Sequence, residues 1–199
     1  MKKVKSNFTG MTISLTVISL IVGGLLAFVN DITTDPIKES KQQNQSKAIK
    51  AVVPEFTYME TDTVEQMIIF KCYNENKLVG TAVSIVGQGF GGDFNIMVGF
   101  NANGEIINYT ILSHKETPGL GSQMAEWFKK KSSIIGKSPK KGDLKVSKDG
   151  GDIDAITAAT ITSRAFLNTI NEAYKTYNSG NHDAVSSATS VEHHEEKNH

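Results

Sequence analysis

A long run of uncharged residues near the N-terminus constrains this chain more than any other feature of its sequence. Residues 6–30 carry no charge, and residues 11–29 are predominantly apolar. A helix needs roughly 20 such residues to cross a bilayer. Because residues 27–29 offer no small-residue cleavage pattern, we predict an uncleaved transmembrane helix at residues 11–30 and not a signal peptide.

The charges that flank this run predict its orientation. Lysine occupies three of the first five positions, whereas Asp31 and Asp35 follow the run. Positively charged residues are retained on the cytoplasmic side of a membrane. We therefore expect residues 1–10 in the cytoplasm and everything after the helix on the extracytoplasmic side.

The composition restricts what the outer part of the chain can do. The 199 residues contain 21 basic and 21 acidic side chains, so no overall positive charge favours nucleic acid as a partner. Cys72 is the only cysteine, which excludes an intrachain disulfide and multi-cysteine metal sites. We predict that Cys72 is buried in a strand, so redox chemistry here would need a bound cofactor.

Apolar runs separated by turns predict an α+β domain at residues 56–177, with a mainly antiparallel sheet and flanking helices. Turn-type segments at residues 74–76 and 101–104 separate neighbouring runs, which favours antiparallel pairing. The predicted strands are residues 67–73, 78–86, 94–100 and 105–113, with shorter ones at 144–146 and 153–156.

Helical periodicity predicts the remaining elements. Residues 31–55 are expected to form a stalk helix with Pro36 in its first turn. Ser122 can cap a short helix, and a longer helix is predicted from about Thr160 to Tyr177. Residues 178–199 lack periodicity, so we expect a disordered tail whose histidines form no metal site.

The glycine-rich segment GQGFGG at residues 87–92 formally matches the dinucleotide fingerprint G-x-G-x-x-G. That fingerprint requires a helix after it, whereas residues 93–98 have the pattern of a strand. We therefore do not predict Rossmann-type binding. The segment is either a connection with unusual backbone angles or a loop that lets a planar ligand approach the backbone.

Two further segments carry candidate functional groups. Residues 113–124 place four polar side chains in succession between a strand and a helix, either as a simple turn or as a functional loop. Thr160 follows small residues at a predicted helix start, where free N–H groups favour a phosphate. An ordinary threonine cap is the alternative. Covalent chemistry on Thr160 would require activation by a neighbour or a separate enzyme.

The segment DAITAAT at residues 154–160 resembles the flavinylation motif of the FMN-binding domain family, and HKETPGLG at residues 114–121 resembles that family's signature loop. In the family the final threonine carries FMN through a phosphoester bond, and by position this is Thr160. Ala158 stands where glycine is commoner, and Thr157 where serine is. The resemblance implies roles in cofactor binding or recognition for Asp154, Thr157, Ala158, Ala159, His114, Glu116, Thr117, Gly119 and Leu120.

The basic start, single span, stalk and outer domain resemble the layout of G subunits of Rnf electron transport complexes. The related C subunits of sodium-pumping NADH:quinone oxidoreductases are typically longer. The resemblance implies an inner-membrane subunit, not a stand-alone catalyst, that passes electrons within a complex coupling ferredoxin and NAD to ion translocation. It also implies that a separate flavin transferase, using FAD and magnesium, attaches the FMN, while the other subunits hold the remaining redox and ion sites.

Two other functions remain compatible with the sequence. The chain could be a membrane-tethered binding or assembly module without a redox role, in which residues 157–160 only cap a helix. It could also be an FMN domain that serves a different extracytoplasmic electron-transfer pathway.

Overall fold

The computed structural model describes residues 8–53, 55–64 and 67–191, without the side chains of residues 34–42 and 180–191. The chain divides into two units, residues 1–44 and residues 45–199. The helices are α1 (Phe8–Val52), α2 (Met124–Lys130) and α3 (Thr160–Val191). The strands are β1 (Tyr58–Val64), β2 (Met67–Asn74), β3 (Lys77–Gln88), β4 (Asp93–Phe100) and β5 (Ile106–His114).

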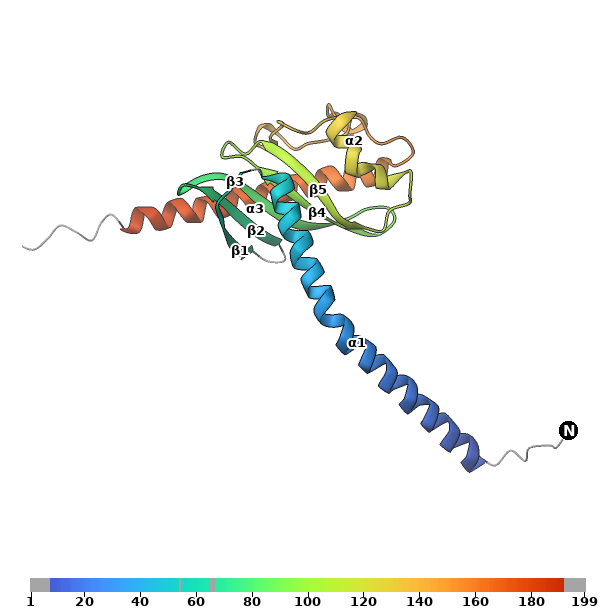
Figure 1. The fold of residues 1–199 in the computed structure, drawn as a ribbon. Coiled ribbons are helices and arrows are strands. Elements are labelled where there is room, and N and C mark those ends of the chain that lie inside the picture. The colour runs from blue at the N-terminus through green and yellow to red at the C-terminus, as the bar shows by residue number, and fades with distance from the viewer. Residues whose placement is uncertain (1–7, 54, 65–66, 192–199) are drawn as a thin grey trace, which may run out of the picture. The chain divides into compact units, whose positions relative to one another are not determined.

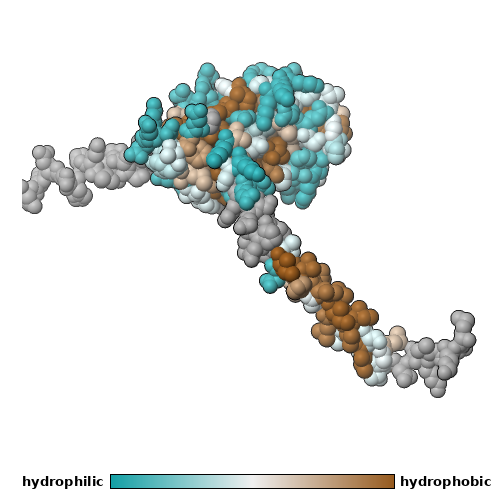
Figure 2. Space-filling model, in the orientation of Figure 1, coloured by the Kyte–Doolittle hydropathy of each residue, from teal (hydrophilic) through white to brown (hydrophobic). Residues whose placement is uncertain are grey.

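The first unit consists of most of α1, the helix that contains the predicted span. Residues 8–33 have a mean hydropathy of 2.3 over their most apolar stretch and bury none of it inside the protein, as expected of a membrane-crossing segment. Figure 2 shows their apolar side chains along the helix in brown. We predicted Pro36 in the first turn of a separate stalk helix, but α1 continues through it. A proline inside a helix removes one backbone hydrogen bond. The hydrogen bonds of the turns before and after Pro36 keep the helix continuous.

The second unit is built on a five-stranded antiparallel sheet in the order β1-β2-β3-β4-β5 (Figure 1). The four predicted strands correspond to β2 to β5, and the turns between them are confirmed. Glu75 and Asn76 adopt positive φ at the first turn, and the Asn101 side chain accepts two backbone N–H bonds at the second. The edge strand β1 escaped prediction because all but its last residue are exposed, leaving no apolar alternation.

The two faces of the sheet bury different partners because strand side chains alternate. On one face, α3 packs through its aromatic and aliphatic stripe over the larger core, crossing the strands as Figure 1 shows. On the other face, Ile49, Val52 and Val53 pack against Phe70 and Met97. The last residues of the predicted stalk helix therefore belong to the core of the domain. Asn108 fixes this end by donating to the Ala51 carbonyl at 2.9 Å.

Three local predictions were wrong. Residues 144–146 and 153–156 do not form strands: a single parallel bridge joins Val146 to Ile153. Ser122 does not cap α2, because its hydroxyl accepts the N–H of Gly119 instead. The last helix continues past Tyr177 to Val191, since no proline interrupts it. Residues 192–199 of the predicted tail lie outside the described residues.

The end of α1 should be essential for the stability of the domain. Ile49 is 1% exposed, so Ile49→Ala should lower the free energy of unfolding by about 2–5 kcal/mol. Urea unfolding of the full chain in detergent, followed through Trp127 fluorescence, measures this. Its exposed neighbour provides the control, since Lys50→Ala should change the value by less than about 0.5 kcal/mol. Equal losses in both variants would contradict the packing described.

Candidate functional site

Three segments singled out in the sequence meet around one cavity of about 330 Å³. They are the glycine-rich connection after β3, the loop after β5 and the start of α3. Phe90, Leu120 and Ile161 border the cavity and are exposed at 73%, 42% and 55%. The remaining lining residues are Glu116, Thr117, Gly121, Ala158, Ala159, Thr160 and Thr162.

Thr160 is the first residue of α3, as predicted, but it does not cap the helix. Ala159 takes the N-cap position, because its carbonyl oxygen accepts the N–H of Ser163 at 3.0 Å. Alanine has no side-chain acceptor, so the cap leaves first-turn N–H groups for another partner. The hydroxyl of Ser163 holds the turn together by accepting from Ile156 N–H and donating to the Ala159 carbonyl, each at 2.9 Å.

The backbone before Thr160 explains why glycine would suit position 158. Ala158 has a φ of 60°, in the left-handed region that costs a residue with a Cβ roughly 1–2 kcal/mol. Residues 157–158 form a turn whose end is closed by the N–H of Ala159 on the Ile156 carbonyl at 3.0 Å. Glycine would adopt this conformation without the penalty.

Glu116 joins the three segments beneath the cavity. Its side chain is buried, and its Oε1 accepts the N–H of Gly91 at 3.2 Å. Its Oε2 accepts the hydroxyl of Thr162 on α3 at 3.0 Å. A side chain at Gly89 or Gly121 would overlap this carboxylate, which is why both positions are glycine.

A second cavity of about 420 Å³ also includes Thr160 and Ala158 in its lining. Asp154 and Thr157 lie there, together with Lys148 from the short helical turn at residues 147–149. The other lining residues are Trp127, Ser147, Ala155 and Ile156.

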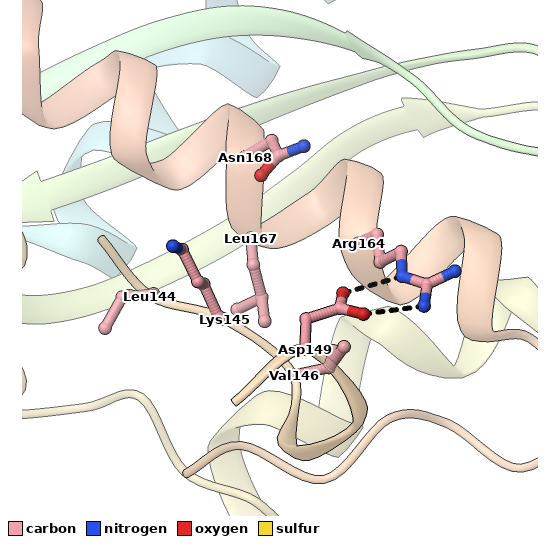
Figure 3. A pocket seen from close by; sticks show the side chains of 7 residues that line it. All are labelled: Leu144, Lys145, Val146, Asp149, Arg164, Leu167 and Asn168. Atoms are coloured by element: carbon pink, nitrogen blue, oxygen red, sulfur yellow. Dashed lines mark hydrogen bonds and ion pairs between the residues drawn. The ribbon is translucent and has the colours of Figure 1, made fainter. Parts of the chain in front are cut away.

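The turn that carries Lys148 is anchored on both sides. Ser147 donates to the Asp154 carboxylate at 3.3 Å, and Asp149 forms two 2.7 Å hydrogen bonds with the Arg164 guanidinium of α3. Figure 3 shows this pair beside a cavity of about 220 Å³. The guanidinium holds the pKa of the Asp149 carboxyl below its usual range.

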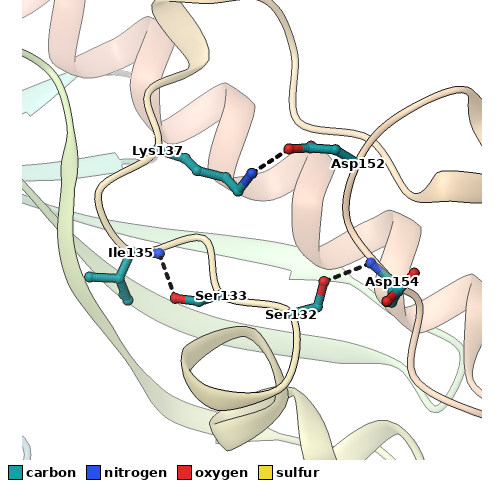
Figure 4. A network of polar contacts seen from close by, with 6 residues as sticks. All are labelled: Ser132, Ser133, Ile135, Lys137, Asp152 and Asp154. Carbon is teal, nitrogen blue, oxygen red and sulfur yellow. Dashed lines mark hydrogen bonds and ion pairs between the residues drawn. The ribbon is translucent and has the colours of Figure 1, made fainter.

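Asp154 is fixed through its backbone, which leaves its carboxylate at the surface. Its N–H donates to the Ser132 hydroxyl at 2.7 Å, and its carbonyl accepts from the Trp127 indole at 2.9 Å. Figure 4 shows the first of these bonds beside an ion pair between Lys137 and Asp152. The network connects the loop after α2 to the segment that leads to Thr160.

The structure brings most of the predicted site residues to the two cavities. Six line the first cavity, Asp154 and Thr157 line only the second, and His114 and Gly119 line neither. Sequence reasoning missed Ile161, Thr162 and Lys148, while Phe90 lay inside the glycine-rich segment whose role was left open. Alternation of polar and apolar residues on α3 gave no signal for Thr162, because its partner Glu116 is distant in sequence.

The described residues hold no other candidate redox or metal centre. No cluster of three metal-ligating side chains occurs in this part of the chain. Cys72 is buried, as predicted, and burial raises the pKa of its thiol to about 11. A thiolate there is disfavoured.

The first cavity has the chemistry that a flavin needs. Its exposed apolar side chains suit a flat aromatic ring, and Gly121 in its lining lets a ligand approach the backbone. Thr160 places a hydroxyl in the first turn of α3, and a helix N-terminus favours a phosphate. The residues present therefore fit FMN.

Comparisons with known proteins identify relatives of this chain. The family model of the FMN-binding domain matches residues 89–175, and that of the RnfG N-terminal region matches residues 1–52. The G subunit of the ion-translocating oxidoreductase complex of Shewanella piezotolerans is 30% identical, covering 89% of this chain and 93% of the relative. That of Shewanella baltica is 31% identical, covering 82% and 86%. The crystal structure of Shewanella oneidensis NqrC aligns with a TM-score of 0.44 at 21% identity, covering 62% of this chain and 66% of that one.

Replacing Ala158 by glycine should stabilise the protein. Because the left-handed strain outweighs the entropy that glycine adds to the unfolded chain, Ala158→Gly should raise the free energy of unfolding by up to about 1 kcal/mol. The matched control Ala155→Gly, without a positive φ, should lower it by about 0.4–1 kcal/mol. Urea titrations of both variants provide the comparison, and a loss in both would refute the strain at Ala158.

The Asp149–Arg164 pair should stabilise the domain only while the carboxyl is ionised. The pKa of Asp149 is lower in the folded chain than in the unfolded one, so its contribution is present above the unfolded pKa. It is lost as the pH falls through the folded pKa. Asp149→Asn should therefore lower Tm at about pH 7, and the difference from wild type should be smaller at about pH 2. Calorimetry at both pH values tests this, and an equally large difference in acid would argue against the ion pair.

Proposed function

Because this chain belongs to the family of G subunits of ion-translocating oxidoreductase complexes, we propose that it carries covalent FMN on Thr160 and passes electrons within such a complex. The observation that carries the proposal is the convergence of three segments on a single apolar cavity beside Thr160. When bound, FMN supplies the electron transfer that the side chains of this chain do not.

The first cavity is the proposed site of the isoalloxazine ring. Phe90, Leu120 and Ile161 offer exposed apolar surface that a ring would cover. Thr117 completes the border from the loop after β5. Excluding water from this surface favours the bound ring and orients it against the loop.

The start of α3 is the proposed site of the phosphate. A phosphodiester on Thr160 keeps one negative charge, which the N–H groups of the uncapped first turn and the helix dipole stabilise. Lys148 lines the second cavity together with Thr160 and adds a positive charge there. Its neighbours Ser147 and Asp149 are held by hydrogen bonds to Asp154 and Arg164. These bonds restrict the backbone that carries Lys148.

Maturation requires a flavin transferase in this proposal. The Thr160 oxygen forms the new bond to the FMN phosphate of FAD, the hydroxyl proton is lost, and AMP leaves. Threonine is too weak a nucleophile for this step unaided, so a separate enzyme with magnesium activates it. The exposed Asp154 carboxylate and Thr157 are suited to recognition by that enzyme, because they lie beside Thr160 in the open second cavity.

The proposed location is the bacterial inner membrane, with a single span at residues 8–33. The N-terminal lysines favour a cytoplasmic N-terminus and a periplasmic flavin domain. Partner subunits of the Rnf-type complex would hold the sites for NADH, ferredoxin and the translocated ion. A covalent bond prevents loss of the cofactor from a domain outside the cytoplasm.

Flavin attachment can be tested directly on denatured protein. Wild-type chain coexpressed with a flavin transferase should fluoresce under ultraviolet light in a denaturing gel and gain the mass of FMN minus water. Thr160→Ala should lose both signals completely, because the bonding oxygen is gone. Thr110→Ala, in a strand outside the three cavities, should retain them. If Thr160→Ala keeps its fluorescence, FMN is attached to another residue and the proposal for Thr160 is wrong.

A further inference from the structure

Glu116 introduces a negative charge into the wall of the first cavity. The side chain lines the cavity, yet the residue is only 5% exposed. Both carboxylate oxygens accept hydrogen bonds, from the N–H of Gly91 and from the Thr162 hydroxyl. Acceptance at both oxygens is the arrangement that suits an ionised carboxylate.

Glu116 forms no ion pair within the described residues. The ion pairs formed there join Lys130 to Glu126, Lys137 to Asp152 and Arg164 to Asp149, and none includes Glu116. The two hydrogen bonds are therefore the direct stabilising contacts of the carboxylate. In a site of low dielectric, such a charge acts on its surroundings more strongly than one in water.

The position of the charge is fixed by the backbone around it. A Cβ at Gly89 would overlap Oε1 of Glu116, and one at Gly121 would overlap Oε2. The glycines thus leave the space that the carboxylate occupies between the connection after β3 and the loop after β5. The hydrogen bonds from Gly91 and Thr162 hold it there.

We propose that Glu116 lowers the reduction potential of the flavin held in this cavity. The inference rests on the proposed function, because it requires the ring to occupy the first cavity. Two-electron reduction of the ring with uptake of one proton adds one negative charge to it. A fixed carboxylate nearby repels that added charge, so the reduced form is disfavoured relative to the oxidised form.

Glu116→Gln removes the charge and preserves the contacts. The amide oxygen can accept from Gly91 N–H, and the amide nitrogen can donate to the Thr162 hydroxyl. In a dithionite titration of the flavin-loaded full chain, followed by absorbance, its midpoint potential should be more positive than that of wild type. We expect at least a tenfold rise in the equilibrium constant for two-electron reduction, or about 30 mV.

Two further variants separate charge from structure. Thr162→Val removes one hydrogen bond but keeps the carboxylate, so it should shift the potential by less than half as much as Glu116→Gln. Thr117→Lys adds a cation at an exposed position beside the carboxylate and should shift the potential in the positive direction. The second variant keeps the inference testable if Glu116→Gln does not fold.

The outcomes distinguish this inference from the proposed function. An unchanged or more negative potential in flavin-loaded Glu116→Gln overturns the inference and leaves flavin attachment intact. An equal positive shift in Thr162→Val overturns it too, because loop geometry would then set the potential. If Glu116→Gln does not fold, an unchanged potential in Thr117→Lys overturns it. A wild-type chain without flavin would remove the proposed function and this inference together.

Discussion

The packing of Phe166 holds the start of α3 against the sheet, and the candidate site depends on it. Its ring stacks on Phe128 of α2 with centroids 4.7 Å apart, and contacts Tyr109 of β5 and Phe94 of β4 at 4.9 and 6.4 Å. All four rings are buried. Thr160 lies about two turns earlier on the same helix, so the packing that immobilises Phe166 also fixes the first turn.

Around that fixed helix start, the two cavities differ in character although both include Thr160. One is bordered by exposed apolar side chains such as Phe90 and Ile161, and the other holds the cation of Lys148. A cofactor with a flat apolar ring and a charged phosphate likewise combines an apolar part with a charged part. This correspondence gives the proposed attachment at Thr160 a physical basis beyond the presence of a hydroxyl.

Local patterns were sufficient to predict much of the fold. The apolar run, four strands and the start of α3 depend on residues close together in sequence, so their periodicity is visible there. The strands predicted at residues 144–146 and 153–156 were wrong, because short apolar stretches occur in irregular segments as well. Strand β1 has an exposed surface and gave no pattern at all.

The sequence by itself determined that Thr160 begins a helix after small residues and that a membrane-length helix precedes the domain. It also indicated that the loop from His114 to Gly121 carries unusual chemistry. Only the tertiary structure decided that Glu116 meets Gly91 and Thr162, and that His114 stays outside both cavities. Contacts between distant segments depend on how α3 packs across the sheet, and no local periodicity encodes that packing.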